Sequence, residues 1–218
     1  MYAIAVAPAW MPALAALLAL LATAGSAATS QGANDQTIAR KPDVVNGERL
    51  FAGCAACHGQ DGSGAKDGSV PAIAGQHWQV LTKLLLDFRY FRRWDARMVN
   101  VSDSDHLRGP QEIADVVAYV SSLPPRHATG GDAAHDVAHG AQAYARMCAT
   151  CHGGEAQGDG PAGQPRLAGQ RYGYLLRQMQ DAAAGRRPTF SQQHILLLQS
   201  LDVLDIQAIS DYLARIGP

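Results

Sequence analysis

The chain contains two copies of the pentapeptide Cys-x-x-Cys-His, and these use all four of its cysteines. The second copy begins 94 residues after the first. Two thiols one helical turn apart can each form a thioether with one vinyl group of a porphyrin, and the next imidazole then faces the iron. This pattern is the attachment signature of c-type haem. It predicts two covalently bound haem c groups, attached through Cys54, Cys57, Cys148 and Cys151 and ligated by His58 and His152.

Paired cysteines also occur in zinc sites, redox-active dithiols and disulfide frameworks. A zinc ribbon separates its pairs by roughly 15–20 residues, far fewer than the separation seen here. A thioredoxin-like dithiol belongs in a βαβ pattern, whereas the surroundings of both motifs are helical in pattern. Disulfides give no reason for a histidine after each pair, so the sequence favours haem.

The two motifs belong to an internal repeat. At an offset of 94, Pro71 matches Pro165 and both copies continue to an Ala-Gly-Gln segment, at 74–76 and 168–170. Further matched pairs are Arg92-Arg93 with Arg186-Arg187 and, after a shift of one residue, Ile113 with Ile206 and Tyr119 with Tyr212. Matching of this extent indicates two similar modules.

Apolar residues at helical spacing predict three helices in each module. The expected helices are 46–57, 77–92 and 111–123 in the first module, and 135–151, 171–184 and 203–216 in the second. A module this small would be marginal on its own core, and a covalently held haem supplies a large apolar centre. We expect an all-α fold of two tandem small domains, each wrapped around one haem c.

The N-terminal residues resemble a secretory signal peptide. Residues 2–28 carry no charge and end in small residues, but no Lys or Arg precedes Arg40, so an uncleaved anchor stays open. The expected divisions are 1–28 signal peptide, 29–43 flexible segment, 44–123 first domain, 124–134 linker and 135–218 second domain. Export to the periplasm follows from this reading.

The charge balance excludes one class of partner. The formal net charge is −1 at pH 7, and both halves are close to neutral. Recognition of phosphates requires a basic excess. We expect no nucleic-acid binding.

Together these residues resemble the cytochrome c4 group of diheme class I cytochromes. The resemblance rests on both Cys-x-x-Cys-His-Gly stretches, on the Pro-x-x-Ala-Gly-Gln segments at 71–76 and 165–170, and on the last helices with Tyr119 and Tyr212. It implies two all-helical cytochrome c folds whose haems exchange electrons. It also implies that the carbonyls of Pro71 and Pro165 accept hydrogen bonds from His58 and His152, which fixes the tautomer of a metal-bound imidazole. A second possible role for the prolines is to stiffen a turn.

The same family places a methionine as distal ligand shortly before the last helix. Met98 lies 44 residues after Cys54 and suits this role in the first module. Ligation by a thioether favours Fe(II) and raises the potential. The alternatives are that Met98 only fills the core and that His106 is the ligand.

The second module departs from this pattern. No methionine follows Met179, which matches Leu85 and is expected to pack in the core. The family's methionine position falls on His194, 46 residues after Cys148. We predict ligation by His152 and His194, and a lower potential for this haem. The alternatives to His194 are an open sixth position and ligation by His135 or His139.

The expected function is electron transfer with no catalytic residues, between partners such as a quinol oxidoreductase, a dehydrogenase or a terminal oxidase. The alternatives are a peroxidase-like or thiosulfate-oxidising enzyme with an open second haem, and a cytochrome subunit of a membrane complex attached through its N-terminus. The run of Arg89, Arg92, Arg93 and Arg97, with Tyr90, Phe91 and Trp94 between them, could form a docking patch, a solvated face or partners for the haem propionates.

Overall fold

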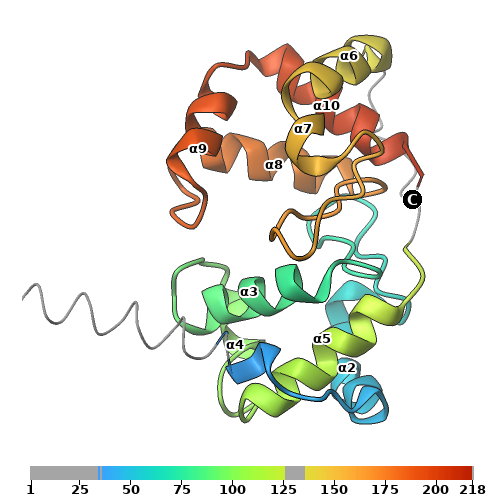
Figure 1. Cartoon of the computed structure of the whole chain (residues 1–218), viewed down its shortest axis with the longest axis vertical. Helices are drawn as coiled ribbons and strands as arrows, with labels where there is room; N and C mark the ends of the chain where they lie inside the picture. Colours follow the sequence, from blue (N-terminus) through green and yellow to red (C-terminus); the bar gives the residue numbers. More distant parts are fainter. Residues whose placement is uncertain (1–33, 35, 126–135, 218) are drawn as a thin grey trace, which may run out of the picture.

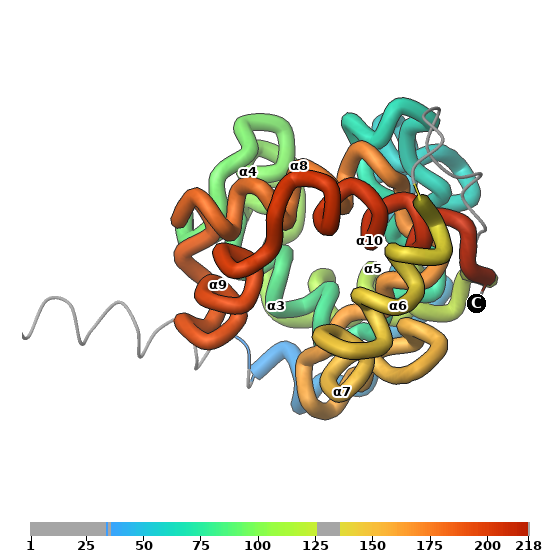
Figure 2. The backbone as a smooth tube through the Cα atoms, turned by 90° about the horizontal axis from the view of Figure 1, so that it is seen from above, coloured from blue at the N-terminus to red at the C-terminus, as the bar shows by residue number. Residues whose placement is uncertain are grey.

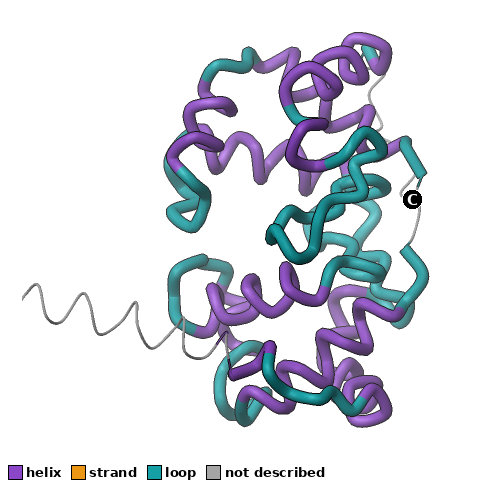
Figure 3. The backbone as a smooth tube through the Cα atoms, in the orientation of Figure 1, coloured by secondary structure: helices purple, strands orange, loops and turns teal. Residues whose placement is uncertain are grey.

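The structure is a computed structural model that describes residues 34, 36–125 and 136–217. Helices and loops make up this part of the chain, with one isolated bridge between Asp159 and Gln164 and no strand (Figure 3). The prediction of an all-α fold is confirmed. Among the described helices, none combines the length and apolar character needed to cross a bilayer. The expected signal peptide, His135 and most of the expected linker lie outside the described residues.

The first module contains four labelled helices. They are α2 (Val44–His58), α3 (Trp78–Arg89), α4 (Ala96–Val101) and α5 (Pro110–Ser122). Asp43 caps α2 by accepting a hydrogen bond from the backbone N–H of Asn46, and Asp95 caps α4 in the same way through Arg97 and Met98. Pro110 begins α5, where a missing N–H costs nothing. The sequence-based expectation of three helices missed α4.

The second module repeats this arrangement with one break. Its helices are α6 (Val137–Met147), α7 (Ala149–His152), α8 (Tyr172–Ala183), α9 (Gln192–Gln199) and α10 (Val203–Arg215). The prediction of one continuous helix over 135–151 is wrong, because Cys148 has φ −117° and interrupts the helix between α6 and α7. Helix α9 was missed like α4, although Ser191 caps it.

Each module has its own hydrophobic core, built where its first helix crosses its last. In the first module Phe51 of α2 packs on Tyr119 of α5, with ring centroids 5.3 Å apart. In the second, Tyr144 of α6 packs on Tyr212 of α10 at 5.6 Å. In both modules the two helices approach each other so closely that the residue at the contact is a glycine. A Cβ on Gly47 would lie 2.0 Å from the carbonyl oxygen of Asp115.

The two modules lie one above the other along the longest axis, with α3 and α8 facing each other across the boundary (Figure 1). The loops that follow each Cys-x-x-Cys-His motif gather at this boundary (Figure 3). Seen from above, α6 to α10 run around the edge of the second module (Figure 2). The fold therefore brings the two glycine-rich loops, which are far apart in sequence, into one region.

Candidate haem-binding sites

His58 ends helix α2 and is buried, with 6% of its surface exposed. Its Nδ1 lies 3.0 Å from the carbonyl oxygen of Pro71. A carbonyl can only accept, so Nδ1 carries the proton and Nε2 presents its lone pair to a metal. Burial lowers the pKa of His58, although the Pro71 hydrogen bond opposes this. The imidazole is therefore held neutral, as a ligand must be.

His152 at the end of α7 has the same surroundings. It is buried, and its Nδ1 lies 3.1 Å from the carbonyl oxygen of Pro165. Burial lowers its pKa too, again against the hydrogen bond to Pro165. Both histidines thus make the contact that the family resemblance implies. A hydrogen bond of this kind fixes the ring plane and raises the basicity of a metal-bound imidazole.

The cysteines are arranged alike in the two motifs. Cys54 and Cys148 are half-buried, whereas Cys57 and Cys151 are exposed. Burial, with a smaller contribution from the second cysteine of the motif, raises the pKa of Cys54 and of Cys148 to about 11. Within the described ranges, no three Cys, His, Asp or Glu side chains converge to hold a metal ion. The arrangement does not support the zinc reading.

Met98 lies on α4, half-buried, in the first module. The charges of Arg97 and Asp95, at the start of α4, make smaller contributions to the pKa of His58 than burial and the Pro71 hydrogen bond do. The competing His106 lies in a surface loop, where its Nδ1 is 2.9 Å from Asp103 and half of the side chain is exposed. The contact with Asp103 does not support His106 as a ligand, and ligation by Met98 stays a prediction.

His194 lies on α9 in the second module and faces His152. The two ring centroids are 6.1 Å apart and the ring planes differ by 46°. A metal held between two imidazole nitrogens, with bonds of about 2 Å each, separates the ring centroids by about 6 Å. Burial lowers the pKa of His194, with smaller contributions from His152 and Arg187. The structure therefore brings together the two residues that the sequence pairs as axial ligands.

The remaining candidates have other contacts. His139 joins α6 to α10, with its Nε2 2.6 Å from an oxygen of Asp205. Met179 packs against the second core, as expected from its position in the repeat. Neither observation supports ligation of the second haem by these residues.

Two arginines near the second site fit a bound haem. Arg187 is only 7% exposed, and its Nε has no hydrogen-bond partner in the described structure; the same is true of the buried Nε of Arg166. Burial, and then the charge of Arg93, lowers the pKa of Arg187 to about 10. Buried cations require an anionic partner. The two propionate carboxylates of a haem are suitable partners for guanidinium groups.

A contact that the sequence did not reveal involves Phe190. Its ring stacks on His194 with centroids 4.8 Å apart, and the guanidinium of Arg187 lies 4.4 Å from the centre of the Phe190 ring. The repeat gave one partial signal, because Arg187 matches Arg93. Nothing in the repeat predicted an aromatic ring that contacts both Arg187 and His194.

The arginines considered as a docking patch have partners inside the molecule. Arg92 pairs with Asp87 at 2.8 Å and Arg97 with Asp95 at 3.0 Å. Arg89 donates to the carbonyl of Leu107, and Arg93 donates across the module boundary to Tyr174 and Gln178. All four therefore have internal partners, while the side chains of Arg92 and Arg97 stay 41% and 60% exposed.

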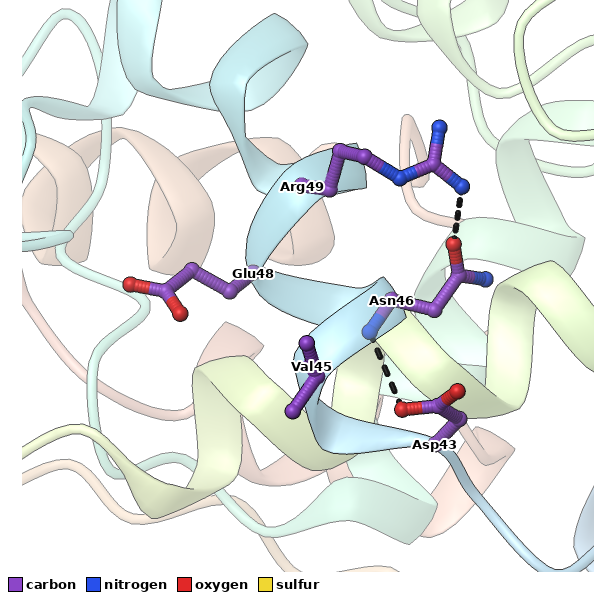
Figure 4. Close-up of a pocket in the computed structure, with 5 residues that line it drawn as sticks. All are labelled: Asp43, Val45, Asn46, Glu48 and Arg49. Atoms are coloured by element: carbon purple, nitrogen blue, oxygen red, sulfur yellow. Dashed lines mark hydrogen bonds between the residues drawn. The ribbon is translucent and has the colours of Figure 1, made fainter.

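Two surface hollows lie apart from these motifs. One, of about 490 Å³, lies at the start of α2 and is lined by Asp43, Val45, Asn46, Glu48 and Arg49 (Figure 4). The other, of about 550 Å³, is lined by nine residues that fall between positions 89 and 104 and include Phe91 and Trp94. The lining of neither hollow includes a cysteine or histidine. Neither hollow therefore adds a candidate haem-binding residue to those of the two motifs.

Two helical modules, each ending a helix in Cys-x-x-Cys-His with the histidine bonded to a proline carbonyl, define a tandem c-type cytochrome. The model of the Cytochrome c family matches residues 44–124 and 137–216. The chain therefore belongs to the cytochrome c family and carries two covalently bound haem c groups.

Similar proteins narrow this class. The chain is 30% identical to cytochrome c4 of Pseudomonas aeruginosa over 213 residues, covering 90% of this chain and 96% of the relative. Reduced recombinant cytochrome c4 from Pseudomonas stutzeri has a similar structure, with a TM-score of 0.71, 26% identity, and coverage of 81% of this chain and 100% of that one. The chain is a diheme electron-transfer protein of cytochrome c4 type.

A thiosulfate dehydrogenase (TsdBA) from Marichromatium purpuratum is also similar. Its TM-score is 0.71 at 28% identity, over 80% of this chain and 40% of that chain. The likeness covers less than half of that protein.

Proposed function

We propose that this protein carries electrons between redox partners through two haems with unequal axial ligands. The first haem has His58 and Met98, and the second has His152 and His194. The observation that carries this proposal is the separation of 6.1 Å between the His152 and His194 ring centroids. That distance suits one metal between two imidazoles.

The difference in axial ligands sets the direction of electron transfer between the two haems. Haem c supplies one-electron exchange between Fe(III) and Fe(II). The thioether of Met98 favours Fe(II), whereas the imidazole of His194 has no such preference. The second module therefore has the lower reduction potential, and electrons pass from it to the first module. Equal or reversed potentials in a redox titration would contradict this direction.

The polypeptide supplies ligands, orientation and exclusion of water. The carbonyls of Pro71 and Pro165 hold the Nδ1 protons of the proximal histidines, so that both Nε2 atoms would have a lone pair free to bind a haem iron. Burial keeps these imidazoles neutral. Arg166 and Arg187 supply buried positive charge for the propionates. These are the tasks of an electron carrier, and none of them acts on a substrate.

The second candidate is an enzyme, such as a peroxidase-like or thiosulfate-oxidising cytochrome. The similarity of this chain to a part of thiosulfate dehydrogenase supports this second candidate. It requires an open iron position in the second module. The place of His194 opposite His152 argues against such a position.

We further propose that the protein acts in the periplasm. Its donors and acceptors are of the classes expected from the sequence: a quinol oxidoreductase, a dehydrogenase or a terminal oxidase. Attachment to a membrane or a complex through the N-terminal segment remains part of this proposal. The mass of the mature protein tests whether that segment is retained.

Low-temperature EPR of the oxidised holoprotein, combined with near-infrared charge-transfer spectra, tests the ligands. We expect one Met-ligated and one bis-imidazole low-spin haem. The bis-imidazole signal should disappear in His194→Ala, and His194→Met should replace it with a second thioether signal. His139→Ala is the matched control and should leave both signals unchanged. A high-spin second haem in the unmodified protein would overturn the proposal and favour the enzyme.

A further inference from the structure

Gln76 and Gln170 stand at matched positions of the repeat, and each makes two hydrogen bonds to the opposite module. The backbone N–H of Ala72 donates to Oε1 of Gln170 at 2.9 Å, and Nε2 of Gln170 donates to the carbonyl of Ala72 at 2.8 Å. The backbone N–H of Arg166 donates to Oε1 of Gln76 at 2.9 Å, and Nε2 of Gln76 donates to the carbonyl of Arg166 at 2.9 Å. The two contacts are therefore reciprocal.

Each contact ends on a peptide group that holds a proximal histidine. The carbonyl of Pro71 and the N–H of Ala72 belong to one peptide unit. That unit accepts a hydrogen bond from His58 at its oxygen and donates one to Gln170 at its nitrogen. A continuous chain thus runs from the imidazole of the first module, through one planar amide, to a side chain of the second.

The mirror chain runs in the opposite direction between the modules. His152 donates to the carbonyl of Pro165, and the N–H of Arg166 in the same peptide unit donates to Gln76. Both chains cross the boundary between the modules, because each joins a peptide group of one module to a glutamine of the other.

The glutamine side chains are held rigidly in place. Oε1 of Gln76 also accepts from the N–H of His77, and Oε1 of Gln170 from the N–H of Arg171. The next residues add a second reciprocal pair, because His77 contacts the carbonyl of Gln157 and Arg171 donates to the carbonyl of Ser63. A rigid acceptor at a fixed position can polarise the amide in front of it.

Hydrogen bonds in series strengthen one another. An acceptor at the N–H of an amide makes the carbonyl oxygen of that amide a better acceptor. A stronger bond from Nδ1 to this oxygen makes the imidazole a more basic ligand, and a more basic ligand favours Fe(III). We propose that Gln170 tunes the haem ligated by His58, and that Gln76 tunes the haem ligated by His152. Each module thus adjusts the basicity of the proximal histidine in the other module.

This inference rests on the two proximal histidines and does not depend on which residues ligate the opposite faces. Its signature is a crossed effect. In the holoprotein with Gln170→Leu, the reduction potential of the first haem should rise, although the substitution lies in the second module. Gln76→Leu should raise the potential of the second haem. We expect a change of about threefold in the reduction equilibrium constant of the affected haem, or about 30 mV, since 59 mV is tenfold for one electron.

Proton NMR of the reduced holoprotein assigns the effect to a haem without reference to the sixth ligands. The Nδ1–H resonances of His58 and His152 are identified by their contacts with Pro71 and Pro165. In Gln170→Leu the His58 resonance should move towards a weaker hydrogen bond while the His152 resonance stays in place. Gln76→Leu should give the reverse.

Arg177→Ala is the matched control, because Arg177 donates to the carbonyl of Gly68 across the same boundary but lies outside both chains. It should move neither resonance. Gln170→Glu keeps an acceptor for the N–H of Ala72 and should not raise the first potential, which separates polarisation from loss of packing. Uncrossed shifts, equal shifts at both haems, or no shift would overturn the proposal. Wrong sixth ligands would instead appear in the EPR spectra and leave the NMR result standing.

Discussion

The ring of Phe190 lies almost parallel to the imidazole of His194, with centroids 4.8 Å apart and an angle of 12° between the planes. The guanidinium of Arg187 lies 4.4 Å from the centre of the same phenyl ring. Packing against Phe190 therefore supports the plane of His194 from outside the pair that it forms with His152. The 46° angle between the two imidazoles is thus fixed by packing in the second module.

Replacing Phe190 should change the electronic structure of the second haem without removing its ligand. In Phe190→Leu the His194 ring loses the aromatic ring that stacks on it, and the angle between the imidazole planes of His152 and His194 should change. We expect shifted g-values for the bis-imidazole signal and unchanged values for the Met-ligated haem. Phe190→Tyr keeps a flat ring and should restore the original g-values. Identical spectra for the Leu variant and the unmodified protein would show that the stack does not orient His194.

Phe91 and Gly185 occupy the same position in the two modules, and both have a left-handed backbone, with φ of 56° and 73°. Glycine adopts this conformation freely, whereas a side chain there costs roughly 1–2 kcal/mol. The ring of Phe91 is 67% exposed and stacks on Trp94, so burial does not offset the strain. The first module therefore holds a strained residue at a turn that the second module makes with glycine.

Three substitutions measure this strain. Phe91→Gly should be more stable than Phe91→Ala by about 1 kcal/mol, because both remove the ring and only glycine relieves the backbone. Gly185→Ala should lower the free energy of unfolding by a similar amount, since the space around Gly185 is open and only the backbone resists. Chemical denaturation of the four holoproteins gives these differences. Equal stability of the two Phe91 variants would contradict the argument.

The repeat and the two haem motifs were enough to predict the two all-helical modules, and the histidines that they propose as ligands, His58 and His152, lie at the ends of α2 and α7. Periodicity also located the long helices to within a few residues. It missed α4 and α9 because six and eight residues are too few to show an amphipathic pattern. The break between α6 and α7 depends on the backbone conformation of a single residue, Cys148, and no periodicity reports that conformation. The reciprocal bonds of Gln76 and Gln170 depend on how the modules meet, which no local pattern contains.

Gly47 and Gly53 lie on the same helix, α2, and substitution by alanine should affect them in opposite ways. A Cβ on Gly47 meets the backbone of Asp115 in α5, whereas a Cβ on Gly53 meets nothing within 4 Å. Gly47→Ala should destabilise the protein by about 1–3 kcal/mol because the helices must move apart. Gly53→Ala should stabilise it by about 0.5–1 kcal/mol through a less flexible unfolded chain. Thermal unfolding of both variants distinguishes these effects, and a tolerated Gly47→Ala would show that the crossing can relax.

Asp115 makes the contact between α2 and α5 dependent on pH. It is 1% exposed, and its carboxylate accepts hydrogen bonds from the backbone N–H of Asp43 and from the side chains of Asn46 and Gln111. Burial acts to raise its pKa, but the three hydrogen bonds outweigh it, so the pKa lies below the usual value. A carboxyl with a lowered folded-state pKa stabilises the protein above its unfolded pKa of about 4, and this contribution is lost as the pH falls through the folded-state value.

Asp115→Asn should therefore lower the free energy of unfolding by about 2 kcal/mol at neutral pH, since a neutral amide accepts fewer and weaker hydrogen bonds. The difference from the unmodified protein should persist down to about pH 4 and shrink below it. Urea denaturation at pH 7, 5 and 3 measures this. Asn46→Ala removes one donor and keeps the carboxylate, so it should give a smaller loss at neutral pH. A constant difference between Asp115→Asn and the unmodified protein at all three pH values would mean that packing, and not the charge of Asp115, holds the two helices together.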